Sequence, residues 1–285
     1  MASSFTRILR SVLRSTYRQT LPSTVRDAIR LQREIVRREL EPVVTDPPAG
    51  RRIVVLAPHM DDEVFGCGGA LARAGAAGST VHVVFLTDGS RGYDPSRVAD
   101  LSESDLSEFR RTLTETRKAE ARRAGAILGF AEPVFLDLPD GHAADGPGAA
   151  ERLAHAIRYL APDTVFLPFP ADPHPDHLAA NRLFVDIVAE SGIRHSVPCW
   201  AYEVWTPLVA NTFVDVTDVM ARKQEAMAMY RSQNLDVDYP RAISSLNTYR
   251  SLAAGLSRGY VEAYFVETVA EYCSMFKRFT SGDGR

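Results

Sequence analysis

The stretch Ile53-Val54-Val55-Leu56-Ala57, followed directly by Pro58-His59-Met60-Asp61-Asp62-Glu63, decides how the rest of the chain is interpreted. Five consecutive apolar residues predict a buried strand, and the polar run predicts a loop at its carboxyl end. A second such unit comes more than a hundred residues later, where a strand near 164–169 precedes Pro173-His174-Pro175-Asp176-His177. In an open parallel sheet, ligands bind beyond the carboxyl ends of the strands. The two loops are therefore expected to converge on one site.

The apolar pattern around these two units alternates strand with helix. Strands are expected near 53–58, 81–87, 133–137 and 164–169, and helices near 66–77, 105–129, 148–160 and 177–191. Right-handed crossovers then predict an α/β fold, with a doubly wound, largely parallel Rossmann-like sheet and helices on both faces. Later strands are expected at 199–205, 213–216 and 260–265, and a helix is expected from Thr217 or Asp218 through Tyr230.

Length and composition narrow the class of protein. With 285 residues and 45% apolar content, the chain can form one large globular domain. Its net charge of -3 argues against a nucleic-acid partner. Cys67, Cys199 and Cys273 show no CxxC spacing, which argues against a disulfide framework and a cysteine zinc site. No apolar run reaches the length of a membrane span and no signal peptide is visible, so a cytoplasmic location is expected.

The first part of the chain differs in kind from the rest. We divide the sequence into an Arg-rich helical extension at 1–50 and a catalytic domain at 51–285. The extension begins with an amphipathic stripe formed by Phe5, Ile8, Leu9, Val12 and Leu13. Such a basic helix either lies on an anionic membrane surface or docks on the catalytic domain or another subunit. We favour these contacts through residues 1–40 over a transit peptide, because a second helix with acidic residues follows. The number of subunits is left open.

The two loops carry the residue types of a metal site. His59 and Asp62 stand three residues apart after the first strand, and His177 offers a third ligand from the second loop. Two histidines and one carboxylate, with an open fourth position for water, form the ligand set of a hydrolytic zinc site. Fe²⁺ or Co²⁺ could occupy the same ligands.

Neighbouring residues in the loops are candidates for the chemistry itself. Asp61 points differently from the ligand Asp62 and is free to act as general base and then as acid toward a leaving amine. His174, as imidazolium, is placed to stabilise the oxyanion of a tetrahedral intermediate. Asp176 is expected to hold one of the histidine rings in the right tautomer.

Residues outside the two loops are candidates for substrate contacts. Arg91 and Asp140 follow later strands, although a solvated surface arginine and a turn-forming Asp-Gly are equally ordinary interpretations. Trp200, Tyr202 and Trp205 are expected in or at the end of one strand. Those on its inner face pack in the core, and any on its other face could form a stacking platform for a sugar ring. Gly66, Gly68 and Gly69 (with Cys67 between them) predict close helix packing rather than a phosphate cradle, because their spacing is not G-x-G-x-x-G.

The two motifs, PHMDDE at 58–63 and HPDH at 174–177, give the chain a family resemblance. It resembles the LmbE-like, or PIG-L, family of zinc-dependent N-deacetylases over about residues 51–265. The family's motifs read PHPDDE or AHPDDE and HPDH, so Met60 replaces a proline and removes its restriction on φ. The resemblance implies that His59, Asp62 and His177 are zinc ligands. It also implies that Asp61 is the general base and that His174 steadies the transition state.

The resemblance also implies a function. We expect a zinc-dependent hydrolase that removes the N-acetyl group of an amino sugar, in an N-acetylglucosamine-type glycoconjugate or a sugar-containing metabolite, and releases acetate. One alternative is hydrolysis of a non-sugar amide or ester by the same chemistry. Another is an inactive metal-binding scaffold that acts through the N-terminal helices. The presence of Asp61 and His174 argues against the scaffold, because a structural zinc site needs neither residue.

Overall fold

The computed structural model describes residues 42–281. The strands are β1 (Val43–Val44), β2 (Arg52–Ala57), β3 (Thr80–Thr87), β4 (Val134–Leu138), β5 (Thr164–Pro168), β6 (Pro198–Tyr202), β7 (Thr212–Asp215) and β8 (Val261–Thr268). The α-helices are α3 (Asp62–Ala76), α4 (Glu103–Leu128), α5 (Ala149–Leu160), α6 (Pro175–Ser191), α7 (Met220–Met227), α8 (Tyr239–Ala253) and α9 (Val269–Ser281). Three short 3-10 helices lie at Pro95–Val98, Ala143–Asp145 and Thr217–Val219.

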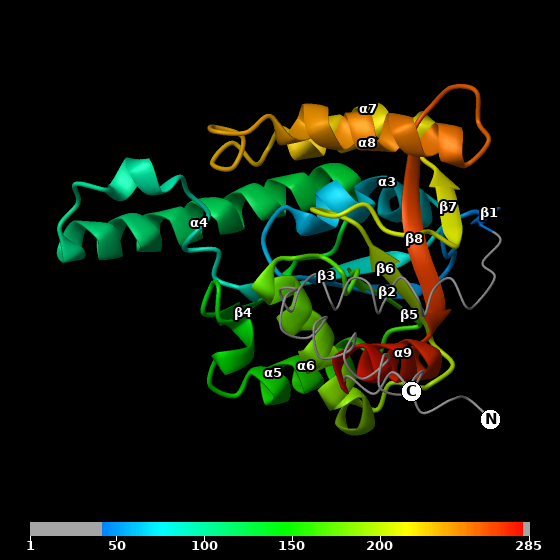
Figure 1. Ribbon diagram of the computed structural model, residues 1–285, viewed down its shortest axis with the longest axis horizontal. Coiled ribbons are helices and arrows are strands. Elements are labelled where there is room, and N and C mark those ends of the chain that lie inside the picture. Colours follow the sequence, from blue (N-terminus) through cyan, green and yellow to red (C-terminus); the bar gives the residue numbers. More distant parts are fainter. Residues whose placement is uncertain (1–41, 282–285) are drawn as a thin grey trace, which may run out of the picture.

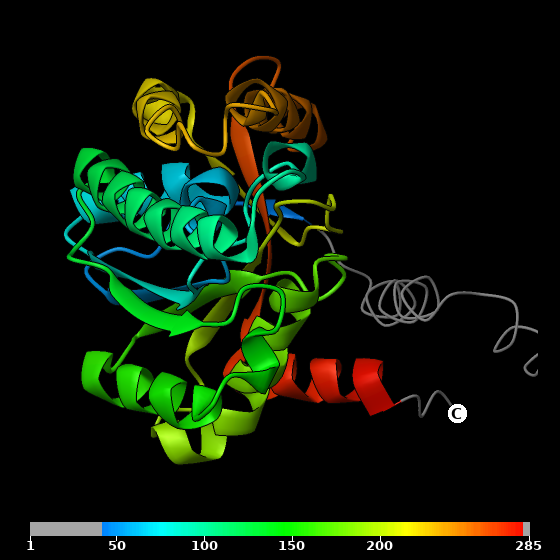
Figure 2. The ribbon, with the colours of Figure 1, turned by 90° about the vertical axis from the view of Figure 1, so that its left-hand side faces the viewer.

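The strands form one sheet with the order β1-β7-β8-β6-β5-β2-β3-β4. Strand β8 runs antiparallel to β6 and β7, while the other neighbours pair in parallel. Helices α3, α4, α7 and α8 cover one face, and α5, α6 and α9 cover the other (Figures 1 and 2). This arrangement confirms the predicted doubly wound α/β fold.

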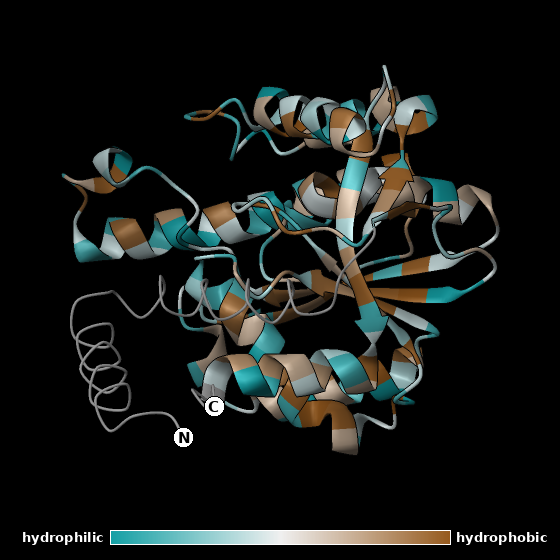
Figure 3. Cartoon of the chain, turned by 45° about the vertical axis from the view of Figure 1, so that its right-hand side comes forward, coloured by the Kyte–Doolittle hydropathy of each residue, from teal (hydrophilic) through white to brown (hydrophobic). Residues whose placement is uncertain are grey.

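Alternation along the strands explains why the sheet is buried on both faces. In β2, Ile53 and Val55 belong to the apolar cluster on the α3 side, whereas Val54 and Leu56 belong to the cluster on the α5 side. All four side chains are fully buried. Figure 3 shows the hydrophobic colouring along the strands between helices of mixed colour. A continuous apolar run is what a strand covered on both faces requires.

Helix α3 lies unusually close to the sheet because of its glycines. A Cβ added to Gly66 would come within 2.3 Å of the Tyr202 ring, and one added to Gly69 would come within 2.7 Å of Val216. Cys67 between them is buried as well. The prediction that these glycines serve packing is confirmed, and the tight fit fixes the start of α3 at the sheet.

The chain order places the two motif loops side by side. After β2 the chain continues to β3 on one side, and after β5 it continues to β6 on the other, while β2 and β5 are themselves neighbours. Their carboxyl ends therefore flank the switch point of the sheet, which is where ligands bind in this class of fold.

The structure differs from expectation at several elements. The region 42–50, which was assigned to the helical extension, contributes β1 as an edge strand paired with β7. The helix after Thr217 ends at Met227 rather than Tyr230, and α8 and α9 were not predicted. The predicted amphipathic helix and the contacts through 1–40 lie outside the described residues, so they stay predictions. Among residues 42–281, no helix is long and apolar enough to span a membrane.

Candidate active site

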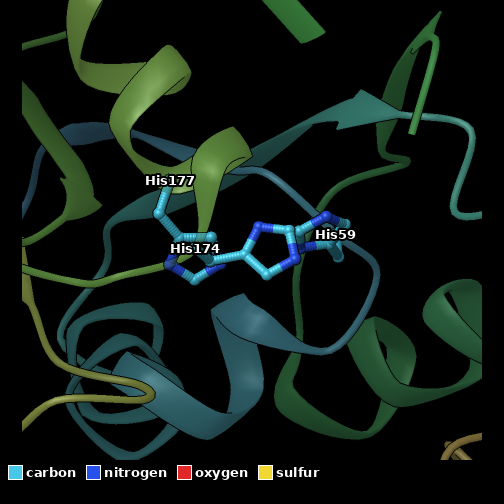
Figure 4. Close-up of side chains that lie close together, drawn as sticks. All are labelled: His59, His174 and His177. Carbon is cyan, nitrogen blue, oxygen red and sulfur yellow. The ribbon is translucent and has the colours of Figure 1, made fainter. Parts of the chain in front are cut away.

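Three histidines meet where β2 and β5 end. His59 lies in the turn after β2, His174 is the N-cap of α6, and His177 lies in the first turn of that helix. The ring centroids of His59 and His174 are 4.5 Å apart, and His177 lies 5.2 Å from His174 and 5.5 Å from His59. Figure 4 shows the three rings turned toward one another. The fold thus brings both motifs to one point.

The carboxylate of Asp62 joins two of these rings. Its Oδ2 lies 3.3 Å from His59 Nδ1 and 3.2 Å from His177 Nε2. Ligands bound to one Zn²⁺ at about 2.0–2.1 Å in tetrahedral geometry are about 3.3 Å from each other. The two distances from Asp62 to the histidine nitrogens therefore match the edge of a zinc tetrahedron.

Other ligand-type atoms lie nearby. His59, His174 and His177 offer atoms within 4.8 Å of one another, and so do His59, Asp140 and Asp176. Asp62 belongs to neither of these two sets, yet within residues 42–281 it alone brings one oxygen to within 3.3 Å of nitrogens on both His59 and His177. This shared oxygen, rather than either looser grouping, marks the candidate metal position.

Further carboxylates lie beside the outer nitrogens of the rings. Asp176 Oδ2 lies 3.1 Å from His59 Nε2, and Asp140 Oδ1 lies 3.4 Å from the same nitrogen. Asp172 Oδ2 lies 3.3 Å from His177 Nδ1. Carboxylates in this position orient a ligating imidazole and raise its basicity. Asp176 and Asp140 both contact His59, and the tautomer-fixing role of Asp176 stays a prediction. Asp172 was not predicted, although it lies only two residues before His174.

The electrostatics of the cluster follow from these contacts. Burial lowers the pKa of His59, but hydrogen bonds with Asp140, Asp176 and Asp62 outweigh it and hold the pKa well above its usual value. Burial also lowers the pKa of His177, but the charge of Asp62 and the contact with Asp172 outweigh this effect and raise the pKa to about 9. Burial would raise the pKa of Asp62, but His177 and His59 hold it far below the usual range. Without a cation, the rings carry the positive charge that balances the carboxylates.

A divalent cation fits this donor set. Neither ring nitrogen of His177 has a partner in hydrogen-bond geometry among the described residues, although the ring is fully buried. Buried polar atoms without partners are costly. Imidazole nitrogens together with carboxylate oxygens are the ligands of zinc and similar transition metals.

Asp61 stands beside the cluster in a strained backbone conformation. Its φ of 146° is a region that residues with a side chain rarely adopt. Glu63 Oε2 accepts the Asp61 backbone N–H at 3.1 Å, and the hydroxyl of Tyr230 donates to the other oxygen of Glu63. Burial raises the pKa of Asp61 to about 7, although nearby Arg117 opposes the rise. A carboxyl with a pKa near neutrality is suited to take up and release a proton.

Arg117 of α4 fixes the loop that carries Asp61. It is 2% exposed, and its guanidinium donates to the carbonyl oxygens of Met60 at 3.0 Å and Gly89 at 3.1 Å. One of its nitrogens lies 3.4 Å from Asp61 Oδ2. Sequence reasoning missed this role of Arg117, and its position on the buried side of α4 was the signal that could have revealed it.

His174 faces the cavity with one ring nitrogen engaged. Its Nδ1 accepts the backbone N–H of Asp176 at 3.2 Å, so a neutral ring carries its proton on Nε2. Burial and the charges of His59 and His177 lower the pKa of His174. A lowered pKa favours the neutral ring, which still offers an Nε2–H donor, and the imidazolium expected from the sequence stays a prediction.

A cavity of about 380 Å³ opens over these residues. Ligand pockets commonly have volumes of about 300–1,000 Å³. The cavity is lined by His59, Asp61, Asp62, Arg91, Gly92, Tyr93, Asp94, Pro95, Arg117, Asp140, His174, Trp205, Ser232, Gln233, Asp236, Val237 and Tyr239. Arg91 donates its backbone N–H to Asp140 at 2.8 Å, so both candidate substrate residues lie at this site. Trp200 and Tyr202 are instead buried in the core.

Comparison with known proteins identifies the family. Residues 54–188, which include both motifs, match the PIG-L family, described as GlcNAc-PI de-N-acetylase. The chain belongs to the PIG-L family. The conserved protein TT1542 from Thermus thermophilus is 31% identical to it in sequence, and its crystal structure aligns with a TM-score of 0.62 over 75% of this chain and 94% of that one.

Named PIG-L relatives include more than one activity. Diacetylchitobiose deacetylase of Thermococcus kodakarensis is 28% identical over 200 residues, which are 64% of this chain and 70% of that protein. 4-Oxalmesaconate hydratase of Pseudomonas putida is 29% identical over 199 residues, which are 63% of this chain and 73% of that protein. Similarity at this level therefore needs the site geometry beside it before a reaction is assigned.

Proposed function

We propose that this protein is a zinc-dependent hydrolase that removes the N-acetyl group of an amino sugar and releases acetate. One observation carries the proposal: Asp61, a carboxyl with a pKa near 7, stands beside two imidazoles that share one oxygen of Asp62, at the base of the cavity. Membership in the PIG-L family supports a deacetylation, and the similarity to a diacetylchitobiose deacetylase supports an amino-sugar substrate.

The proposed ligands are His59, Asp62 and His177. A zinc ion held there would supply Lewis acidity toward the acetyl carbonyl and toward the attacking water. Zinc is our choice because two imidazoles and one carboxylate match its usual hydrolytic ligand set, and Fe²⁺ or Co²⁺ would be held by the same atoms. Asp176 and Asp172 would keep His59 and His177 aimed at the ion through the outer ring nitrogens.

Asp61 would manage the proton. It accepts a proton from the attacking water as the carbon–oxygen bond forms, and it returns that proton to the amine nitrogen as the carbon–nitrogen bond breaks. The Arg117 guanidinium, 3.4 Å from Asp61 Oδ2, limits where the carboxyl can turn. The backbone contact with Glu63 holds it in its unusual conformation.

His174 and Arg91 complete the assignment. The Nε2–H of His174 would donate to the carbonyl oxygen as negative charge develops on it. Arg91 would reach a sugar hydroxyl, because its guanidinium lines the cavity and no ion pair engages it among the described residues. Asp140 would hold His59 from behind while it anchors the Arg91 backbone.

Release of acetate tests the proposed function. The protein is stripped with a chelator, reloaded with Zn²⁺, Fe²⁺ or Co²⁺, and assayed for acetate against a panel of N-acetyl amino sugars and non-sugar acetamides and esters. We expect acetate from the sugars only after a metal is restored. Acetate from the non-sugar compounds alone would show that the protein is a hydrolase of non-sugar amides or esters.

The similarity to a hydratase gives one specific rival. In that reaction water adds to a carbon–carbon double bond, and no acetate forms. The same reloaded protein is therefore tested on an unsaturated dicarboxylic acid by the loss of ultraviolet absorbance. Hydration in the absence of acetate release from any N-acetyl compound would overturn the deacetylase proposal.

A further inference from the structure

One end of the cavity is aromatic and apolar, in contrast to the charged end at the histidines. Trp205, Val237 and Tyr239 line that end. Trp205 is 50% exposed and Val237 is 46% exposed, although large apolar side chains gain free energy from burial. Trp205 comes from the loop after β6, Val237 from the segment before α8, and Tyr239 is the first residue of α8.

This aromatic end is tied to the histidine cluster. Asp172 Oδ2 accepts the backbone N–H of Trp205 at 3.0 Å, and the same oxygen lies 3.3 Å from His177 Nδ1. The rings of Trp205 and Tyr239 meet edge to face at 5.6 Å. Tyr239 packs in turn on Phe65 of α3 at 5.4 Å. The exposed indole is thus held at a set place relative to the reacting groups.

Several polar side chains that line this part of the cavity already have partners. Ser232 donates to Glu120 at 2.6 Å, and the Gln233 amide donates to the Gly92 carbonyl at 3.0 Å. Asp94 accepts the backbone N–H of Ser96 at 2.8 Å. Asp236, next to Val237 in the chain, forms an ion pair with Arg97 at 3.9 Å. With these groups engaged, Trp205, Val237 and Tyr239 supply the apolar surface for a ligand in this cavity.

We propose that Trp205, Val237 and Tyr239 form a subsite for an aromatic or apolar ring attached to the amino sugar. The inference rests on the proposed function, since the acetamido group would lie at the histidine cluster while the attached ring extends toward Trp205. Aromatic rings stack or meet edge to face with a favourable energy beyond that of burial alone. A platform that is ordered before binding loses little entropy when the ring arrives.

Two substrates that differ only in the attached group test the subsite. The methyl and p-nitrophenyl glycosides of N-acetylglucosamine, of the same anomer, are compared by kcat/KM. We expect the wild type to favour the p-nitrophenyl glycoside, and Trp205→Ala to lower that ratio about tenfold. Trp205→Phe, which keeps a ring, should retain most of the preference. Leu252→Ala is the matched control, because this side chain is 66% exposed on α8 and does not line the cavity.

Fluorescence gives a readout that does not need turnover. The chain has two tryptophans, and Trp200 is only 7% exposed. In the Asp61→Asn variant, the p-nitrophenyl glycoside should quench the emission of Trp205, and Trp205→Phe in that background should abolish the quenching. An unchanged kcat/KM ratio in Trp205→Ala, together with quenching that survives Trp205→Phe, would overturn the subsite. If the wild type releases acetate from neither glycoside, the proposed function fails instead, and quenching alone then decides the subsite.

Discussion

At the scale of single residues, two adjacent aspartates have opposite properties. The positive charges of His177 and His59 hold the pKa of Asp62 low against the effect of burial, so it remains a carboxylate. Burial raises the pKa of Asp61 to about 7. The φ of 146° at Asp61 is what lets neighbouring side chains point into such different surroundings. Adjacent residues can thus serve as ligand and as base.

Substitution separates the two roles. Asp61→Asn should keep the metal but lower kcat about 100-fold to 10,000-fold, because it removes the proton acceptor. Asp62→Asn should lose most of the bound metal, because it removes the negative charge of the carboxylate that lies between His59 and His177. Metal content by mass spectrometry, measured beside acetate release, checks both. A near-normal kcat in Asp61→Asn would remove the base assignment.

Tyr230 acts on Asp61 through Glu63. Tyr230→Phe removes the hydroxyl that holds Glu63, whose other oxygen holds the Asp61 backbone. We expect kcat to fall about tenfold or more with the metal content unchanged, because misplaced catalytic groups lose rate steeply. Tyr264→Phe is the matched control, since this buried tyrosine donates to Glu262 at 2.6 Å. Equal losses of kcat in the two variants would mean that Tyr230 matters only for stability.

Metal uptake should depend on pH through the histidines. In the metal-free protein the pKa of His59 is well above its usual value and that of His177 is about 9, so both rings are protonated at pH 7. A metal binds only the deprotonated ring, so uptake at pH 7 should release about two protons and tighten as the pH rises. Calorimetry in buffers of different ionisation enthalpy counts these protons. Uptake without proton release would show that the histidines are not the ligands.

At the scale of elements, the strands were the part most accessible to prediction. The four predicted central strands lie within one residue of the observed bounds of β2, β3, β4 and β5, because each is mostly a run of apolar residues that the sheet buries. Helix α8 was missed because its buried face includes Asn247 and Arg250. Their partners, Lys223 and Glu203, are distant in sequence. An apolar periodicity cannot reveal such a face.

Contacts between residues that are distant in sequence also limited the prediction of the site. The candidate ligands stand in two recognisable loop motifs, so their types and spacing were readable in the sequence. Asp172 and Arg117 act on the candidate site through contacts that exist only after folding. Neither residue type nor spacing distinguishes them from ordinary loop and helix residues.

A buried ion pair secures α3 behind the site. Lys223 donates to Glu262 at 2.7 Å with both side chains fully buried, and Glu262 also accepts the backbone N–H groups of Gly69 and Ala70 at 2.8 Å. Lys223→Met would leave the carboxylate without its cation, so we expect a loss of about 3–5 kcal/mol in the free energy of unfolding. Chemical denaturation measures it, with the exposed Lys277→Met as control. Equal midpoints for the two variants would contradict this role.

At the scale of the whole molecule, the sheet topology assembles the site. His59 and His177 belong to loops that only the neighbouring positions of β2 and β5 bring together. Neither loop offers the proposed ligand set alone. A cation bound to both loops would also stabilise the folded chain, because it binds the native state and not the separated segments.

The position of the metal tests this account most directly. Crystals soaked in Zn²⁺ and measured at the zinc absorption edge give an anomalous map that locates the ion without reference to activity. We predict one peak about 2.0–2.2 Å from His59 Nδ1, Asp62 Oδ2 and His177 Nε2. A peak held instead by His59, Asp140 and Asp176, or no peak at the ends of β2 and β5, would contradict it.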